Sequence, residues 1–341
     1  MRAGEIRSRN GAAVLLWCAP FMQYRFKHLV EYGALRALSA VLNALPYRAA
    51  LAVAWVFAAA AFHLLRFRRE ETARRVREVF GEGMPDREVR RVAWLSLRNM
   101  SFNAAEMMRA PSIDLKWIDR HIPDFRNHIS EVKALIDQHG GAVIAVPHMG
   151  NWDLAGWACH RYGIKMFSIA GKQKNPLVNA WINRQRESGM TILERGGGTL
   201  KQIIRLLRGG NVLAILPDVR VYTPDLKAPF LGTTANVGRG MAMFAISAKV
   251  PIIPAVFRRE GWTRHGFDHF PPIFPDPSLP KEQDARRITE AVLAHVDAAI
   301  RRAPGQWFWY NKRWVLTPVR ETNGEGATSA PQTPSEERNP A

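Results

Sequence analysis

Short apolar runs alternate with amphipathic segments from about residue 130 to residue 302. The apolar runs are rich in β-branched residues and end at polar turns, which predicts buried strands. In the segments between them, apolar positions recur at helical spacing. Strands that alternate with helices predict an α/β domain, with a largely parallel central sheet flanked by helices. We expect strands at 143–146, 164–169, 190–193, 211–216, 252–257 and 262–272, helices at 130–138, 176–187, 199–208, 238–248 and 281–302, and a further helix ending at residue 160.

The N-terminal part has a different pattern, which predicts a hydrophobic helical membrane anchor. Residues 24–45 have the pattern of an amphipathic helix that ends near Pro46. The following run from Ala49 to Leu65 is apolar except for His63. A helix of this length measures about 26 Å, at the lower margin for crossing a bilayer. A buried core helix is the alternative interpretation of the same run.

These patterns divide the chain into four regions. Residues 1–23 carry arginines and then a short apolar stretch, but no small-x-small cleavage site follows, so we expect an interfacial segment or extension that is not removed. Residues 24–127 form a helical membrane-associated region, and 128–320 form the α/β domain. Residues 321–341, rich in Pro, Ser, Thr and Glu, are expected to be a disordered tail.

The charge balance changes the expected partners. A net charge of +18 and a pI near 10.6 favour an anionic partner. Eleven Trp beside many Arg favour an anionic membrane surface, and no zinc-finger spacing or aromatic RNA-binding motif supports nucleic acid. Residues 66–98 are the most basic part and follow the apolar helix, as the cytoplasmic flank of an anchor does. Cys18 and Cys159 lie far apart, and we interpret both as reduced packing residues. On the expected helix 85–109, Glu106 is a candidate functional residue, but we expect it to be a solvent-exposed carboxylate.

The segment 141–156, which reads GAVIAVPHMGNWDLAG, carries the first candidate chemistry. His148 lies just past the end of a buried strand, where α/β sheets usually bind their ligands. On one continuous helix, His148 and Asp153 would lie about 140° apart, so they can meet only if His148 is in the turn and Asp153 in the first helical turn. A carboxylate placed there would hold one imidazole nitrogen while the other accepts a proton. The alternative is an ordinary turn in which Asn151 or Asp153 caps the helix.

Three other features are candidates for substrate contacts. Residues 211–218 form a second buried run ending in Pro-Asp, which brings Asp218 to the same sheet edge as His148. Arg184 and Arg186 lie about 200° apart on one helix, so only one of them is expected to face the site, and we choose Arg184. The backbone amides of the glycine-rich segment 194–199 could bind phosphate at the start of the next helix. Alternatively, this segment forms a flexible turn.

Several of these motifs resemble the bacterial late acyltransferases of lipid A biosynthesis, of the lysophospholipid acyltransferase superfamily, and the related phosphatidylinositol mannoside acyltransferases. The hexapeptide from His148 to Asp153 is similar to the HX4D/E signature. Asn175-Pro176-Leu177 with the Arg184 and Arg186 pair resembles the family's NPL…RxR segment, and residues 229–240 resemble the loop and helix start that follow in the family. The resemblance extends over residues 25–317, to a closing PGQWFWY segment followed by Arg313.

Two positions depart from the family pattern. Where the family often has PDxD, this chain has Pro217-Asp218-Val219-Arg220, so the second acid is missing. The histidine of the closing signature is replaced by Asn311. Any role that needs two carboxylates at the first of these positions is therefore in doubt.

The resemblance implies an O-acyltransferase at the cytoplasmic face of the inner membrane. It implies transfer of a fatty acyl group from an acyl carrier protein or coenzyme A thioester to a hydroxyl of a glycolipid such as a lipid A precursor, with no cofactor and no metal. His148 is then the general base and Asp153 fixes its tautomer. We expect the turn of Gly150 and Asn151 to receive the oxyanion, and Arg184 or Arg186, with Asp218, to bind substrate.

Three alternatives remain open. A phosphatidylinositol mannoside or lysophospholipid acyltransferase would share the chemistry and differ in the acceptor. A metal-dependent hydrolase would use His148, Asp153 and Asp218 as ligands. A non-catalytic membrane-binding protein would be favoured if Asp218 lay far from the His–Asp pair.

Overall fold

The computed structural model describes residues 24–187, 189–194, 199–221 and 226–317. The expectations for the segment 1–23, for the glycines of 195–198 and for the tail 321–341 concern residues outside this part of the chain.

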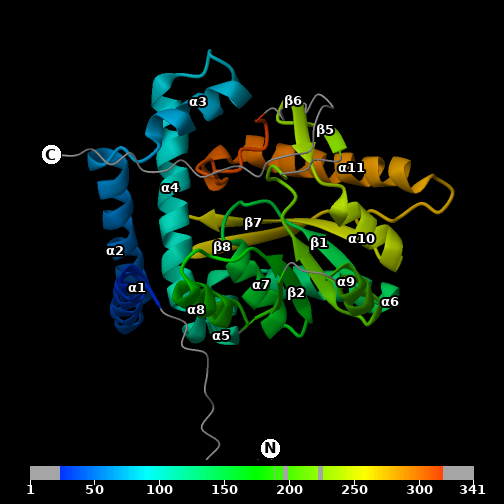
Figure 1. Cartoon of the computed structure of the whole chain (residues 1–341), viewed down its shortest axis with the longest axis horizontal. Coiled ribbons are helices and arrows are strands. Elements are labelled where there is room, and N and C mark those ends of the chain that lie inside the picture. The colour runs from blue at the N-terminus through cyan, green and yellow to red at the C-terminus, as the bar shows by residue number, and fades with distance from the viewer. Residues whose placement is uncertain (1–23, 188, 195–198, 222–225, 318–341) are drawn as a thin grey trace, which may run out of the picture.

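A largely parallel sheet organises the fold, as the alternating pattern predicts (Figure 1). Its strand order is β3-β2-β4-β1-β7-β8, and every neighbouring pair is parallel except β7 with β8, which form an antiparallel pair. The strands are β1 (Ala142–Ala145), β2 (Met166–Ala170), β3 (Thr191–Glu194), β4 (Val212–Ile215), β7 (Ile252–Glu260) and β8 (Arg264–His269).

Helices connect these strands and cover the sheet. Their ends carry recognisable signals: Asn151 caps one helix through its side chain, and Gly140 ends another with a φ of 69°. The helices are α3 (Arg69–Phe80), α4 (Asp86–Met108), α5 (Leu115–His121), α6 (Phe125–His139), α7 (Trp152–Arg161), α8 (Pro176–Glu187), α9 (Thr199–Arg208), α10 (Gly240–Ala248) and α11 (Lys281–Arg302), with short 3-10 turns at Ala110–Ser112 and Pro304–Gln306.

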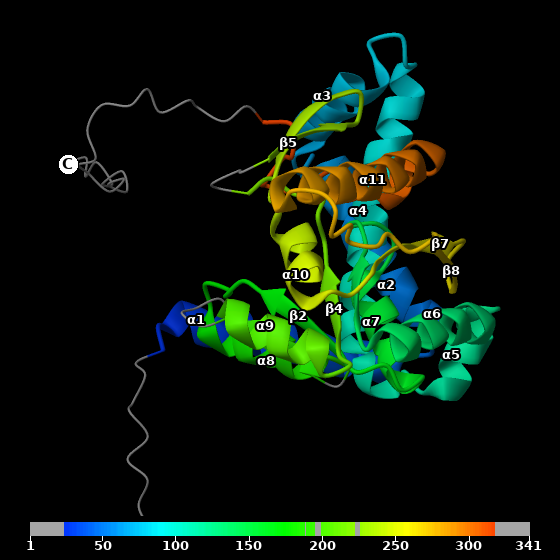
Figure 2. The same ribbon diagram turned by 90° about the vertical axis from the view of Figure 1, so that its right-hand side faces the viewer.

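Helices bury both faces of the sheet. Side chains alternate between the two faces along each strand. On β1, Val143 and Ala145 join the core formed with α9, α10 and α11. Ala142 and Ile144 point the other way, into the core formed with α5, α6 and α7. Figure 2 shows α10 and α11 on one side of the strands and α5, α6 and α7 on the other. The helices cover the two faces but not the carboxyl ends of the parallel strands, and a site can form at these ends.

The N-terminal helices α1 (Phe26–Ala44) and α2 (Tyr47–Ala59) pack on α4 at one side of the α/β body (Figure 1). With the π-helical turn η1 (Ala60–Leu64), α2 forms the segment Tyr47–Leu64, which has a mean hydropathy of 1.5. It is the one helix among the described residues that is long and apolar enough to cross a membrane, and only 28% of it is buried. Its exposed apolar side chains are weak evidence that this segment anchors the protein in a membrane.

One element differs from the expectation for residues 229–240. The expected loop is an antiparallel hairpin of β5 (Leu226–Phe230) and β6 (Thr233–Val237), whereas the expected helix start is present, since α10 begins at Gly240. Side chains alternate between buried and exposed along β5. Leu231 and Gly232 form its turn with φ of 56° and 82°, as a tight hairpin requires. The boundary expected at residue 128 lies within α6.

Candidate active site

His148 and Asp218 meet at the carboxyl edge of the sheet. His148 follows β1 and Asp218 follows β4, and these two strands are parallel neighbours, with Ala145 aligned with Ile215. Since both strands end at the same level, the residues after each Pro lie side by side. His148 Nδ1 is 2.8 Å from Asp218 Oδ1; an ionised carboxylate can only accept, so Nδ1–H is the donor, and in the neutral ring Nε2 then carries the lone pair. Among the described residues, none hydrogen-bonds to this Nε2.

Asp218 is held from three directions. Its Oδ2 accepts hydrogen bonds from the His148 backbone N–H at 2.7 Å and from the Trp307 indole Nε1 at 2.7 Å. The carboxylate is fully buried, whereas the His148 side chain is 18% exposed. Burial alone would raise the pKa of Asp218, but the facing imidazole and these hydrogen bonds outweigh it and hold the pKa below its ordinary value. The pair therefore combines an ionised, fixed carboxylate with a partly accessible ring.

Asp153 does not occupy the place expected for it beside the ring. It stands in the first turn of α7, where its Oδ1 accepts a hydrogen bond from Arg186 Nε at 2.9 Å. The carboxylate that contacts His148 is Asp218, so the expected His148–Asp153 contact is wrong. The five-residue spacing places Asp153 on the first turn of α7. The parallel pairing of β1 with β4 places the carboxylate of Asp218 at Nδ1 instead.

The choice between Arg184 and Arg186 is reversed in the same way. Arg184 is exposed on α8, whereas Arg186 is partly buried and faces Asp153. The helical angle correctly implied that only one of the two faces the site. Which one it is depends on how α8 is rotated about its axis, and α8 packs against α1 and β3 with Trp181 as its buried residue.

Gly150 and Asn151 are held in the turn after His148 by hydrogen bonds to other parts of the protein. The Gly150 N–H donates to Gln306 O at 3.1 Å, and the carbonyl of Gly150 accepts from Asn103 Nδ2 at 2.5 Å. The Asn151 side chain accepts from Leu154 N and donates to Glu106 Oε2 at 2.6 Å. The Gly150 N–H and the Asn151 side chain are thus committed to protein contacts, and the role of the two residues in binding substrate stays a prediction.

Glu106 is the anchor of this turn and is only 1% exposed, contrary to the expectation of a solvent-exposed carboxylate. It pairs with Arg259 at 2.6 Å and accepts from Tyr47 Oη at the start of α2. Burial alone would raise the pKa of Glu106, but the charge of Arg259 holds it below the usual range. The network links α2, α4 and β7 to the residues that follow His148.

Replacing Gly150 by Ala is expected to destabilise the protein by roughly 2–5 kcal/mol. Its φ is 58°, and a Cβ would lie 2.0 Å from the Phe257 carbonyl oxygen on β7. Gly163→Ala is the matched control, because Gly163 has a φ of 86° but no atom within 4 Å of a Cβ. The unfolding midpoints of both variants in detergent would separate the clash from the backbone strain. An equal shift for the two would contradict the packing role of Gly150.

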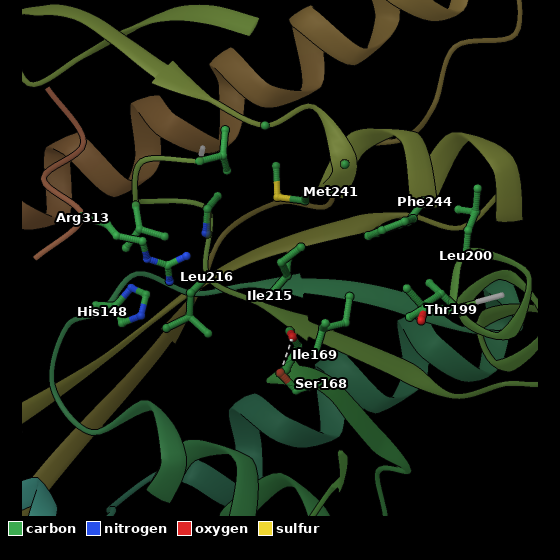
Figure 3. Close-up of a pocket in the computed structure, with 17 residues that line it drawn as sticks. His148, Ser168, Ile169, Thr199, Leu200, Ile215, Leu216, Met241, Phe244 and Arg313 are labelled. Atoms are coloured by element: carbon green, nitrogen blue, oxygen red, sulfur yellow. Dashed lines mark hydrogen bonds between the residues drawn. The ribbon is translucent and has the colours of Figure 1, made fainter. Parts of the chain in front are cut away.

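Two cavities meet at His148. The first measures about 440 Å³ and lies between the sheet and the helices α9 and α10. Aliphatic side chains line most of it, while His148 and Arg313 lie together at one end (Figure 3). The second measures about 360 Å³, lies beside α7, and includes Asp153, Arg186 and Lys172. Both sizes are in the range of small-molecule sites. One imidazole is thus accessible from an apolar and a polar cavity.

The C-terminal segment supplies site residues that the sequence analysis missed. Trp307 hydrogen-bonds to Asp218, and the Phe308 N–H donates to the His148 carbonyl at 2.9 Å. These aromatics were among the residues of the closing segment, but sequence spacing alone did not indicate which of them reaches the site.

A histidine held by a buried carboxylate, at the end of a mainly apolar cavity, has the geometry that a general base for a hydroxyl or water would need. The model of the bacterial lipid A biosynthesis acyltransferase family matches residues 20–315. The chain therefore belongs to this family.

Similar characterised proteins have modest identity. The phosphatidylinositol mannoside acyltransferase of Mycobacterium tuberculosis is 24% identical over 218 residues, which cover 62% of this chain and 66% of that protein. The lipid A biosynthesis acyltransferase of Haemophilus influenzae is 28% identical over 186 residues, 53% of this chain and 55% of that protein. The match thus spans about two thirds or less of these relatives. The 1-acyl-sn-glycerophosphate acyltransferase PlsC of Thermotoga maritima superposes with a TM-score of 0.35 and 17% identity, covering 77% of this chain and 98% of that one.

Proposed function

We propose that this protein is a membrane-associated O-acyltransferase. It moves a fatty acyl group from an acyl carrier protein or coenzyme A thioester to a hydroxyl of a glycolipid such as a lipid A precursor. Family membership supports the reaction class, and the observation that carries the mechanism is the 2.8 Å contact between His148 Nδ1 and Asp218. An alcohol is a poor nucleophile at neutral pH, so a base has to remove its proton as it attacks. Nε2 of His148 is the group available for this.

In this mechanism Asp218 takes the role that we first assigned to Asp153. It keeps the proton on Nδ1 and stabilises the imidazolium that forms when Nε2 accepts the proton. Asp153 instead holds Arg186 at the second cavity, where the guanidinium is placed to bind a phosphate or sugar hydroxyl of the acceptor. No covalent acyl-enzyme is needed in such a direct transfer.

The two cavities suggest a division between donor and acceptor. We assign the acyl chain to the first cavity, because its lining away from His148 consists mainly of aliphatic residues such as Ile203, Ile215 and Met241. We assign the acceptor to the second, where Arg186 and Lys172 complement an anionic headgroup. The thioester carbonyl and the attacking hydroxyl then meet at His148, which lines both.

The N-terminal helices support association with the cytoplasmic face of the inner membrane. α1 and the segment Tyr47–Leu64 lie on the same side of the molecule (Figure 1), and both carry exposed large apolar side chains. These side chains are Phe26, Leu29, Val30, Val41, Trp55, Val56, Phe57 and Leu64. The basic residues of α3 follow directly and would lie near anionic headgroups.

Gly240→Leu is expected to shorten the acyl chain that the enzyme accepts. A Cβ at Gly240 would have only the Phe244 ring near it, at 3.9 Å, so a larger side chain projects into the first cavity without a backbone clash. Transfer of a 16-carbon chain should fall about tenfold relative to a 10-carbon chain. Competition between the two donors, followed by mass spectrometry of the product, measures the ratio. Gly33→Leu, at an open position on α1, should leave it unchanged. An unchanged ratio for Gly240→Leu would contradict the assignment of this cavity.

The function is tested with purified full-length protein in mixed micelles. Acyl carrier protein and coenzyme A thioesters are each offered with a lipid A precursor, a phosphatidylinositol mannoside and a lysophospholipid, and products are identified by mass spectrometry. An ester formed on the glycolipid supports the proposal, and preference for another acceptor selects the related acyltransferase. Hydrolysis that EDTA abolishes would instead favour the metal-dependent hydrolase. That alternative lacks support from the geometry, since Asp153 is paired with Arg186 and no metal-binding cluster of His, Cys, Asp or Glu occurs among the described residues.

A further inference from the structure

The backbone amides nearest His148 are not available to a substrate. The His148 N–H donates to Asp218 at 2.7 Å, the Met149 N–H to Pro147 O at 2.7 Å, and the Gly150 N–H to Gln306 O at 3.1 Å. Acyl transfer places a negative charge on the former carbonyl oxygen, and a fixed donor there provides much of the catalysis in such reactions. These three amides are therefore committed to protein acceptors, and a donor elsewhere near His148 has to be considered.

Arg313 has the position for this role. It lines both cavities that meet at His148, and also the narrow space bounded by Asp218 and Trp307 behind the ring. Figure 3 shows its guanidinium next to the imidazole, at the same end of the first cavity. By contrast, Arg186 lines only the second of these cavities. Among the described residues, Arg313 is the only cationic Lys or Arg side chain shared by all three spaces.

The head group of Arg313 is uncommitted while its backbone is held. Its N–H donates to Asn311 Oδ1 at 2.9 Å, and its carbonyl accepts from Arg220 N at 3.3 Å. Within the described part of the chain, the guanidinium makes no hydrogen bond and no ion pair. The Arg313 side chain is partly buried beside the His148–Asp218 pair, so its guanidinium is available to a negatively charged ligand in the cavity.

We propose that Arg313 donates to the oxyanion of the tetrahedral intermediate, a proposal that rests on the acyltransferase function above. The acceptor hydroxyl oxygen bonds to the thioester carbon as its proton passes to His148 Nε2. The carbonyl electron pair moves to oxygen, where the Arg313 N–H groups bind it. The pair then returns, the carbon–sulfur bond breaks, and the proton on Nε2 passes to the departing thiolate. The products are an ester and a thiol, and His148 is again neutral.

Binding of a charged mimic tests the proposal without turnover. Dodecylphosphonate presents anionic oxygens at the head of an alkyl chain, and dodecanol presents a neutral head. Arg313→Met should weaken the affinity for dodecylphosphonate by about tenfold or more, as expected for loss of a charge-assisted hydrogen bond, and change that for dodecanol by less than about twofold. Lys312→Met is the control, because Lys312 is the exposed neighbouring cation and lines neither cavity. Equal phosphonate affinity in Arg313→Met and the unmutated protein would overturn the proposal.

Kinetics supply the second measurement. Arg313→Met should lower kcat by about 10²–10³-fold with KM for the thioester changed little, the effect of removing one oxyanion donor. Arg313→Lys should recover part of the loss. Full kcat in Arg313→Met would overturn the proposal and direct attention to the first-turn amides of α7. If the unmutated protein binds the phosphonate through Arg313 but makes no ester, the acyltransferase function fails while the anion site stands.

Discussion

His148→Ala is expected to lower kcat/KM for acyl transfer by roughly 10²–10⁴-fold, the usual contribution of a positioned general base. Without the imidazole, no other group among the described residues stands at the end of β1 to take the hydroxyl proton. The side chain is partly exposed and its ring packs edge-on to Trp152 at 5.0 Å, so its removal should leave the fold intact. Initial rates with purified protein, a fixed thioester and a varied acceptor measure the change.

The control for this variant is His160→Ala, which removes an exposed imidazole from the last turn of α7. Its rates should match those of the unmutated protein. Both variants should float with lipid vesicles to the same extent, since neither residue lies on the N-terminal helices. Near-normal turnover in His148→Ala would rule out the base assignment, whatever the acceptor.

Asp218→Asn is expected to reduce kcat by about 10²–10⁴-fold while KM changes little. An amide can still accept a hydrogen bond from the His148 N–H or from Trp307. However, an Asn amide nitrogen facing Nδ1 donates a proton, which favours the ring tautomer in which Nε2 is protonated and unable to act as a base. An amide also provides no negative charge to stabilise the imidazolium. Steady-state kinetics at neutral pH separate the two parameters.

Asp153→Asn provides the matched comparison, since it makes the same change at the other carboxylate of the site. Because Asp153 holds Arg186 at the second cavity, this variant should raise KM for the acceptor more than it lowers kcat. A large loss of kcat in Asp153→Asn with normal kcat in Asp218→Asn would return the orienting role to Asp153. Because the pKa of Asp218 is lowered in the folded protein, the stability that its carboxylate contributes is present above its unfolded pKa and is lost as the pH falls through its folded pKa.

The turn that carries His148 is fixed from the side of the N-terminal helices. Glu106 and Asn103 of α4 hold Asn151 and the carbonyl of Gly150, and Tyr47 at the start of α2 hydrogen-bonds to the same Glu106 carboxylate. The helices that we assign to the membrane and the residues that we assign to catalysis are therefore joined by one buried polar network. Such a network keeps the base in a constant position relative to the bilayer surface from which a lipid acceptor would arrive.

The order of strands and helices could be read from the sequence because hydrophobic periodicity is a local property. Buried runs ending in Pro-His and Pro-Asp predict strand ends, and in a parallel sheet such ends share an edge. This placed His148 and Asp218 at one edge, and the parallel pairing of β1 with β4 confirms it. The hairpin of β5 and β6 was missed, since its alternation is short and the turn residues Leu231-Gly232 were interpreted as a loop.

Contacts between elements were decided only by the tertiary structure. Helical spacing gives the angle between Arg184 and Arg186, but the rotation of α8 against α7 decides that Arg186 meets Asp153. Likewise, spacing allowed Asp153 to approach His148, while strand order brought Asp218 to Nδ1 instead. The sequence alone thus determined the elements, the sheet edge and the residue types available for chemistry. Which carboxylate, arginine and amide act was determined by packing between segments far apart in the chain, because side-chain partners across elements depend on register and rotation that local periodicity does not contain.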